Sequence, residues 1–195
     1  MRVLLKAGWC CVLVFLVGCG QESAEVAESG KIASTGVVAF PPAQFYQVKD
    51  HQGKTLDLRD YKGRIVLLNF WATWCGPCRY EIPDLVKMRA DYDPEKVAII
   101  GVSLDQGSEE QVRPLLGKFI DRYSINYPIV LDGRGELVRQ FFRRDLSSMA
   151  VPMTFVIDQQ GRVYKEHVGV PRDSKGKLNP RGALSEDIEV LLARS

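Results

Sequence analysis

The sequence predicts an α/β domain with a central β-sheet, and three observations lead to this fold class. Residues 64–70 (RIVLLNF) and 97–104 (VAIIGVSL) are continuous apolar runs, as expected of strands that are buried on both faces. A helical segment is expected after each run, and strands that alternate with helices are typical of a sheet covered by helices. About 160 residues follow from position 37 onward, which is the size of one domain.

The N-terminus has the features of an export signal. Arg2 and Lys6 flank an apolar run at residues 7–17, which is much shorter than the about 20 residues needed to cross a bilayer. Residues 16–19 read LVGC and resemble the lipobox of bacterial lipoprotein signals. We therefore expect residues 1–18 to be a signal peptide and Cys19 to carry the lipid. The alternative is an ordinary signal, or a short uncleaved anchor, with a chance cysteine.

The next segment is expected to be a tether. Residues 20–36 (GQESAEVAESGKIASTG) are small and polar, with almost no large apolar side chain. Together with the lipidated cysteine, residues 19–36 would form a flexible link with a root-mean-square span of about 20–25 Å. These features predict a protein of the bacterial cell envelope, lipid-anchored to a membrane, with its domain on the periplasmic or extracytoplasmic side.

The charge balance gives no indication of a nucleic-acid partner. The whole chain has a formal net charge of +2. Removal of the signal peptide would leave equal numbers of basic and acidic residues, and no basic stripe runs along the sequence.

The secondary-structure elements are expected in the following order. Short strands at 44–49 and 55–58 flank a turn at 50–53 and form a hairpin, and the buried strand at 64–70 leads into a helix at 75–92. The second buried strand, 97–104, leads into a helix that is capped by Ser108 and extends to about residue 123. A short strand at 127–131, a helix at 137–142, strands at 153–158 and 162–168, and a terminal helix at 184–193 complete the chain.

The number and spacing of the cysteines limit the roles that they can have. Of the five, Cys10 and Cys11 leave with the signal peptide and Cys19 is acylated, so Cys75 and Cys78 remain. A disulfide between them closes too short a loop to stabilise the fold much. A structural zinc site normally needs four ligands, and the histidines, His51 and His167, are distant in sequence from the cysteine pair.

An electron-carrying role has a physical basis. Cys75 is expected to open a helix, where free N–H groups and the helix dipole stabilise a thiolate. Cys75 would be the exposed nucleophile, and Cys78, one turn later, would be shielded and would resolve the mixed disulfide. Pro77 suits an early helical position because its missing N–H is not needed there. Gly76 would keep the approach to the sulfur open, and Trp74 would cap the site with a flat apolar surface.

The segment FWATWCGPC, followed by EIP, resembles the active site of the thioredoxin superfamily and is most similar to the TlpA/ResA group of membrane-tethered thiol–disulfide oxidoreductases. The resemblance covers residue 37 to the C-terminus. It implies that residues 37–195 form a thioredoxin-like domain: a central mixed β-sheet flanked by helices, with an N-terminal β-hairpin extension and a central strand–helix insertion. It also implies that the Cys75–Cys78 disulfide is the redox centre, with no further cofactor and no metal.

The resemblance implies roles for three further residues. Val151 and Pro152 (in MAVPMTFVID) resemble the cis-proline loop that faces the cysteine pair, with the Val151 backbone binding an extended substrate chain. The alternative is a trans proline at a strand start. Glu81 corresponds to an acidic residue near the disulfide that would accept or relay a proton, with a pKa raised by its apolar site; the alternative is a solvated helix residue. Cytoplasmic-type thioredoxin has a buried Asp where this chain has Asn69, which cannot titrate.

The implied function is the reduction of disulfides in exported proteins, with apocytochrome c before haem attachment as one candidate substrate. The implied electron donor is a membrane relay of the CcdA/DsbD kind. Several alternatives stay open: a disulfide oxidase or isomerase, a copper-binding assembly factor of the Sco type, and a non-redox binding lipoprotein. A peroxiredoxin-type peroxidase is a further alternative, although that group has Thr or Ser, and an upstream Pro, where this chain has Ala72 and Leu68.

Overall fold

The structure is a computed structural model that describes residues 47–142, 147 and 150–194. The predicted signal peptide, the lipidated Cys19, the tether and the first residues of the hairpin lie outside the described residues. The proposed boundaries of these segments therefore stay predictions. In the part of the chain that is described, no helix combines the length and the apolar character needed to span a bilayer.

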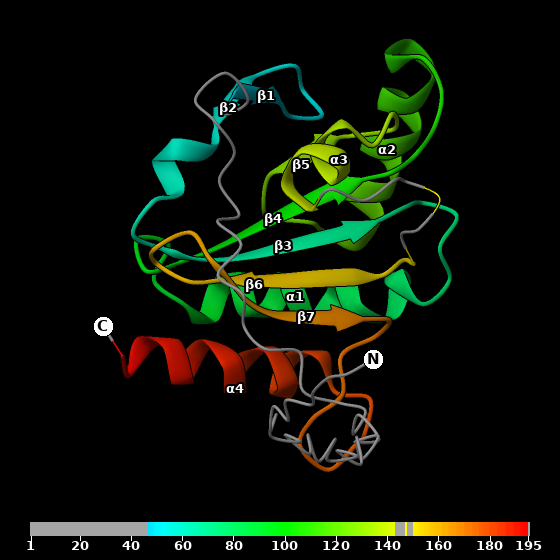
Figure 1. Ribbon diagram of the computed structural model, residues 1–195. Helices are drawn as coiled ribbons and strands as arrows, with labels where there is room; N and C mark the ends of the chain where they lie inside the picture. The colour runs from blue at the N-terminus through cyan, green and yellow to red at the C-terminus, as the bar shows by residue number, and fades with distance from the viewer. Residues whose placement is uncertain (1–46, 143–146, 148–149, 195) are drawn as a thin grey trace, which may run out of the picture. The chain divides into compact units, whose positions relative to one another are not determined.

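The core of the domain is a five-stranded sheet with the order β5-β4-β3-β6-β7 (Figure 1). The strands β3, β4 and β5 are parallel, whereas β6 is antiparallel to both of its neighbours, β3 and β7. The predicted mixed sheet is thus confirmed. The strand bounds are Ile65–Trp71 for β3, Val97–Ser103 for β4, Ile129–Leu131 for β5, Met153–Ile157 for β6 and Val163–Val168 for β7.

Helices and the hairpin cover both faces of this sheet (Figure 1). Apolar side chains of α1 (Cys78–Asp91), α2 (Glu109–Tyr123) and α4 (Pro180–Leu192) share one buried cluster with alternate residues of β3. The intervening residues of β3 join a second cluster with α3 (Glu136–Phe142) and with the hairpin of β1 (Gln47–Lys49) and β2 (Thr55–Asp57). Each fully buried Leu or Ile contributes about 1.5–3 kcal/mol to stability.

The strand register brings three polar residues to one face of the sheet. Asn69 lies opposite Thr154 on β6, and Thr154 lies opposite His167 on β7. Residues that are directly opposite in antiparallel strands point to the same face. Asn69 alternates with Ile65, Leu67 and Trp71, which pack toward α1, so the three polar side chains lie beneath the same helical layer.

The structure differs from the sequence expectations mainly at helix starts. The helix expected from residue 75 begins at Cys78, and a 3-10 helix, η2 (Leu58–Tyr61), follows the hairpin where a strand end was expected. The last helix begins at Pro180, four residues earlier than expected from its apolar pattern. Asn179 accepts a hydrogen bond from the Gly182 N–H at 3.0 Å and caps this helix, and Pro180 occupies its first position.

Candidate active site around the Cys75–Cys78 disulfide

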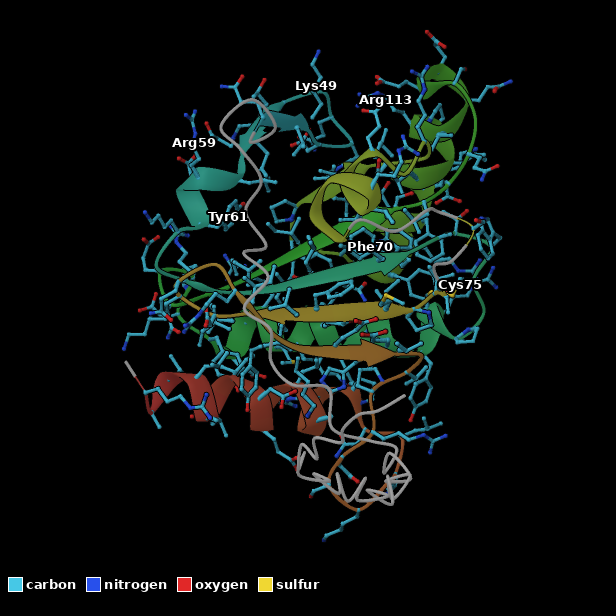
Figure 2. The ribbon with its side chains drawn as sticks, in the orientation of Figure 1. Lys49, Arg59, Tyr61, Phe70, Cys75 and Arg113 are labelled. Atoms are coloured by element: carbon cyan, nitrogen blue, oxygen red, sulfur yellow. A yellow bond between two sulfur atoms is a disulfide. The ribbon has the colours of Figure 1, made fainter. Side chains whose placement is uncertain are left out.

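The two cysteines form a disulfide at the carboxyl end of β3, with an S–S distance of 2.00 Å and a Cα–Cα distance of 5.4 Å (Figure 2). The chain leaves the sheet after Trp71 and makes a turn in which the Cys75 N–H donates to the Ala72 carbonyl at 3.1 Å. Helix α1 then begins at Cys78. The redox pair therefore connects a loop residue to the first residue of a helix.

The prediction that Cys75 opens the helix is wrong, because Cys75 lies three residues before α1. The interaction that the prediction rested on is nevertheless present. The Cys78 N–H donates to Cys75 Sγ at 3.1 Å, and the N–H groups of the first helical turn have no partner within the helix. A thiolate at Cys75 would accept this bond and would be stabilised by the helix dipole.

The exposure of the site also differs from the expectation. In the disulfide form, Cys75 is 3% exposed and Cys78 is 1% exposed, so the prediction of an exposed Cys75 is wrong for this state. The surrounding residues are open instead: Trp74 is 65% exposed, and Gly76 and Pro77 are exposed. A partner would thus reach the sulfurs across these three residues.

The predicted cis bond between Val151 and Pro152 is confirmed. Pro152 directly precedes β6, and Met153 pairs with Phe70 of β3. This register brings Pro152 level with Trp71, at the edge of the sheet from which the cysteine turn starts. Pro152 is buried, and its carbonyl accepts a hydrogen bond from the Gly169 N–H at 2.8 Å.

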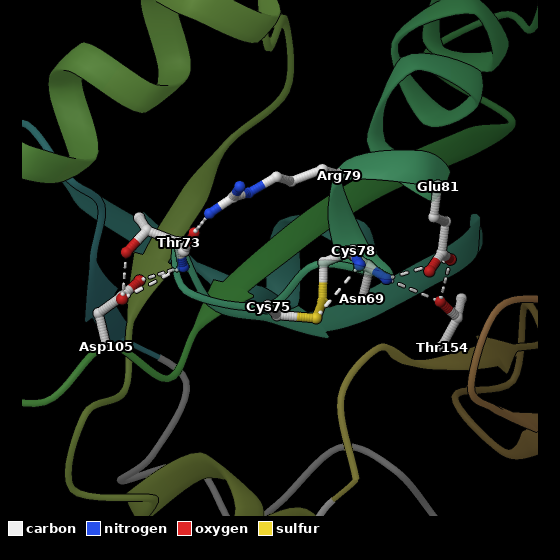
Figure 3. The surroundings of a disulfide bond; sticks show 8 residues. All are labelled: Asn69, Thr73, Cys75, Cys78, Arg79, Glu81, Asp105 and Thr154. Atoms are coloured by element: carbon white, nitrogen blue, oxygen red, sulfur yellow. Dashed lines mark hydrogen bonds between the residues drawn. A yellow bond between two sulfur atoms is a disulfide. The ribbon is translucent and has the colours of Figure 1, made fainter.

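Glu81 lies within the protein, one helical turn after Cys78 (Figure 3). Its side chain is 1% exposed, so the alternative of a solvated residue is wrong. Its Oε1 atom accepts hydrogen bonds from Thr154 Oγ1 at 2.8 Å and from Asn69 Nδ2 at 3.2 Å. Asn69 Nδ2 also donates to Thr154 Oγ1 at 2.8 Å, which joins the three side chains in one cluster.

This environment changes the acidity of Glu81. Burial raises the pKa of Glu81 from an ordinary value of 4.5 to about 7, although the hydrogen bonds from Thr154 and Asn69 lower it in part. Both of these partners are uncharged. The carboxyl group can therefore bind or release a proton near neutral pH, as the sequence resemblance implied.

A second carboxylate lies on the other side of the disulfide, and sequence reasoning missed it. Asp105 follows β4 and accepts hydrogen bonds from the Thr73 N–H at 3.0 Å and from Thr73 Oγ1 at 2.6 Å. On the opposite side of Thr73, Arg79 Nη2 donates to the Thr73 carbonyl at 2.9 Å (Figure 3). The available signal was that Thr73 and Asp105 each lie two residues after the end of one of two buried parallel strands, and the carboxyl ends of parallel strands meet at the same end of a sheet.

His167 is buried and forms a hydrogen bond with Asp187 of α4. Its Nε2 atom is 2.7 Å from Asp187 Oδ2, and Lys165 Nζ is 2.8 Å from Asp187 Oδ1. Burial alone would raise the pKa of Asp187, but the hydrogen bonds from His167 and Lys165 hold it below its ordinary value. Among the described residues, no group of three or more His, Cys, Asp or Glu side chains is arranged to hold a metal ion.

Comparison with known proteins gives a consistent result. The AhpC/TSA family matches residues 41–166. Thioredoxin-like protein YneN of Bacillus subtilis is 31% identical over 163 residues, which are 83% of this chain and 89% of the relative. Thiol-disulfide oxidoreductase ResA of Bacillus subtilis is 28% identical over 173 residues, or 89% and 88% of the two chains.

A solved structure, that of a putative thiol:disulfide interchange protein DsbE from Chlorobium tepidum, superimposes with a TM-score of 0.62 at 27% identity and covers 80% of this chain and 96% of that one.

Proposed function

Because the chain belongs to the AhpC/TSA family of thioredoxin-like proteins, we propose that it is a thiol-disulfide oxidoreductase that reduces disulfides of exported proteins. One observation carries this proposal: Cys75 and Cys78 form a disulfide at the start of a helix, with the Cys78 N–H directed at Cys75 Sγ. This arrangement stabilises the thiolate that a reductase needs as its nucleophile.

The reaction proceeds in two exchange steps. In the reduced protein, the Cys75 thiolate attacks one sulfur of the substrate disulfide, forms a mixed disulfide and expels the other substrate sulfur as a thiolate. Cys78 then loses its proton and attacks the Cys75 sulfur. This step forms the Cys75–Cys78 disulfide and releases the substrate as a dithiol. Two electrons pass from the protein to the substrate, and the expelled thiolates take up protons.

In this reaction Glu81 acts as the proton acceptor for Cys78. A general base is most effective when its pKa is near the working pH, and burial brings the pKa of Glu81 to about 7. When an electron donor later reduces the disulfide, the same carboxyl group returns the proton to Cys78 as that sulfur leaves. Asn69 and Thr154 hold the carboxyl group in place.

The substrate chain binds in an extended conformation beside Val151 and Pro152, across the exposed residues Trp74, Gly76 and Pro77. The half-buried Val151 lies two residues before β6, outside the paired part of that internal strand. Its backbone forms hydrogen bonds with an extended substrate chain in the way that a neighbouring strand would.

A peroxidase is not favoured, although the family name covers a fold that peroxidases share. The peroxidatic site needs a hydroxyl three residues before its cysteine. Here that position is Ala72, which is fully buried, and Leu68 replaces the upstream proline.

The protein acts in the bacterial cell envelope. The LVGC motif supports cleavage after residue 18 and lipidation of Cys19, with the domain on the periplasmic or extracytoplasmic side.

The Cys75–Cys78 disulfide is the whole redox centre, without a further cofactor. A membrane relay of the CcdA/DsbD kind supplies electrons, and apocytochrome c is a candidate substrate.

Trapping of the mixed disulfide tests the exchange mechanism. The reduced mature Cys78→Ser variant, without residues 1–18 and with Cys19 acylated, should form a stable covalent complex with a disulfide-bonded peptide, because the resolving thiol is absent. The Cys75→Ser variant should form none. Mass spectrometry of the non-reduced product checks both results, and trapping through Cys78 in the Cys75→Ser variant would contradict the assignment of the nucleophile.

The midpoint potential of the Cys75–Cys78 pair decides whether the protein reduces or oxidises its substrates. The reduction potential of thioredoxin is about −270 mV, and that of the oxidant DsbA is about −120 mV. A midpoint of the Cys75–Cys78 pair near or below that of thioredoxin supports a reductase. A value close to that of DsbA would make the protein an oxidase or isomerase.

The role of Glu81 is tested by Glu81→Gln, which keeps the shape of the side chain but cannot titrate. Loss of a general base typically lowers a rate by about 100-fold or more. We expect the variant to resolve a preformed mixed disulfide about 100-fold more slowly at pH 7 and to lose the rise in rate centred near the pKa of about 7. An unchanged pH profile would remove Glu81 from the mechanism.

A further inference from the structure

We propose that Asp105 is a positioning residue for thiol–disulfide exchange, which holds the turn that carries Cys75; this inference rests on the proposed function. Thr73 lies two residues before Cys75, and all of its polar groups are bound. Its N–H and hydroxyl donate to Asp105 at 3.0 and 2.6 Å. Its carbonyl accepts from Arg79 Nη2 at 2.9 Å. Figure 3 shows Asp105 and Arg79 on opposite sides of Thr73.

Asp105 can hold the turn because it is itself attached to the sheet. Ser103, the fully buried last residue of β4, donates through Oγ to Asp105 Oδ2 at 2.7 Å and accepts from the Asp105 N–H at 3.2 Å. The Leu104 N–H donates to the Trp71 carbonyl at 2.8 Å, which joins the ends of β4 and β3. The carboxylate therefore extends from a rigid strand end to a residue in the turn.

The backbone packing on the far side of Asp105 adds to this rigidity. A Cβ atom at Gly133 would lie 2.4 Å from the Asp105 carbonyl oxygen, which is far closer than atoms can approach without displacement. Only a glycine lets the loop after β5 approach Asp105 this closely.

The turn needs such support mainly in the reduced state. After Trp71 the chain leaves the strand ladder, and Trp74, Gly76 and Pro77 are exposed. In the oxidised protein the disulfide ties the turn to α1. When that bond is opened, the contact between Thr73 and Asp105 still ties the turn to the sheet, at the stage when Cys75 must attack. A displacement of a reacting atom by about 1 Å can lower a rate by up to about 100-fold.

Asp158 provides a matched control. It is a buried carboxylate in a turn that accepts backbone N–H bonds from Gln160 at 3.0 Å and from Arg162 at 2.9 Å. It follows β6, which runs antiparallel to β3, so it lies at the end of the sheet away from Cys75. Removal of the Asp158 carboxylate breaks similar hydrogen bonds but leaves the contacts of the cysteine turn in place.

The experiment measures the rate at which the reduced mature protein, without residues 1–18 and with Cys19 acylated, reacts with oxidised glutathione, a small disulfide that makes few contacts outside the site. We expect Asp105→Ala to react about tenfold more slowly than wild type, because the turn is no longer held. Asp105→Asn should react within about threefold of wild type, since its amide oxygen still accepts the Thr73 N–H bond. Asp158→Ala should react within about twofold, since its bonds are remote from the site.

A double-mutant cycle tests whether the effect passes through Thr73. Thr73→Val keeps the shape of the side chain but removes the hydroxyl that donates to Asp105. If the two residues act through one contact, the Thr73→Val/Asp105→Ala variant reacts no more slowly than Asp105→Ala alone. Additive losses would overturn the proposal. If Asp105→Ala does not fold, Thr73→Val alone tests it: loss of the hydroxyl that donates to Asp105 should slow the reaction, and an unchanged rate would overturn the proposal.

The possible failures are distinguishable. Wild-type protein that does not react with the disulfide refutes the proposed function itself. Wild type that reacts, with Asp105→Ala reacting at the same rate, refutes only the positioning role. An equal slowing in Asp105→Ala and Asp158→Ala also refutes it, because a general loss of stability would then account for both.

Discussion

Glu81 and Asp105 lie on either side of one disulfide and use the same functional group differently (Figure 3). Glu81 is 1% exposed, and its Oε1 atom accepts bonds from the uncharged side chains of Asn69 and Thr154. Within the described residues, its Oε2 atom has no hydrogen-bond partner. Asp105 is only half-buried and accepts bonds on both of its oxygen atoms, including one from a backbone N–H.

The difference shows that the number of hydrogen bonds and the degree of burial give two carboxyl groups different chemical properties. A carboxylate that accepts many bonds fixes the groups that donate them. A carboxyl group that is buried with few donors binds its proton more tightly and becomes able to exchange it near neutral pH. Under the proposals made above, the first arrangement holds the turn before Cys75, and the second supplies a proton acceptor for Cys78.

The largest expected effect is on the pH dependence of stability. Since burial raises the pKa of Glu81 from 4.5 to about 7, its stabilising contribution is complete below pH 4.5 and is lost as the pH rises through 7. The shift corresponds to about 3 kcal/mol. We expect Glu81→Gln, in the disulfide form, to be more stable than wild type at pH 8 by up to this amount, and to show a flat profile between pH 5 and 8. Urea unfolding at both pH values checks this.

Asp105→Asn sharpens the same test. It removes the carboxyl group on the other side of the disulfide but leaves Glu81 in place, so the stability of this variant should fall between pH 5 and 8 as that of the wild type does. A flat profile in Asp105→Asn, or a retained fall in Glu81→Gln, would mean that the titrating group is not Glu81.

A smaller effect on stability is expected at another buried carboxylate, Asp187. This residue has a cationic partner, Lys165, whereas the hydrogen-bond partners of Glu81 are uncharged. Asp187 is bound by Lys165 and His167, and its pKa is held below the ordinary value. Its stabilising contribution is present above its unfolded pKa and is lost as the pH falls through the folded one. We expect Asp187→Asn to be roughly 2 kcal/mol less stable than wild type at pH 7, with Lys165 contributing little because it is half-exposed.

Acid unfolding followed by circular dichroism checks this prediction. The difference between Asp187→Asn and wild type should shrink below about pH 4, where the carboxylate of the unfolded chain is protonated. A difference that grows at low pH would contradict the assigned direction of the pKa shift.

The smallest expected effect concerns the hydrogen bond from Thr154. Thr154→Val removes a donor to Glu81 Oε1 and leaves the Asn69 amide as the remaining donor to that atom. We expect the pKa of Glu81 to rise by about one further unit, which corresponds to one hydrogen bond to a charged group. The midpoint of the pH dependence of stability measures this shift. Thr73→Val, the matched loss of a hydroxyl beside Asp105, should leave that midpoint unchanged.

The expectations from sequence were most accurate where the signal is local. The buried strands β3 and β4 match their apolar runs within one residue at each end, because a strand buried on both faces has to be apolar throughout. The start of α2 at Glu109 was also predictable from its Ser108 cap. The start of α1 was not, because the CxxC turn precedes the helix and its residues resemble early helical positions.

The sequence by itself determined the fold class, the redox pair and the position of the cis proline, since each is encoded in adjacent residues or in a short motif. Only the tertiary structure decided which polar groups surround that pair. Thr73 and Asp105 are 32 residues apart in the chain, and Glu81 and Thr154 are 73 residues apart. These pairs meet because strand register and sheet order bring β3, β4 and β6 side by side, and neither apolar periodicity nor a local motif specifies which side chains will then face each other.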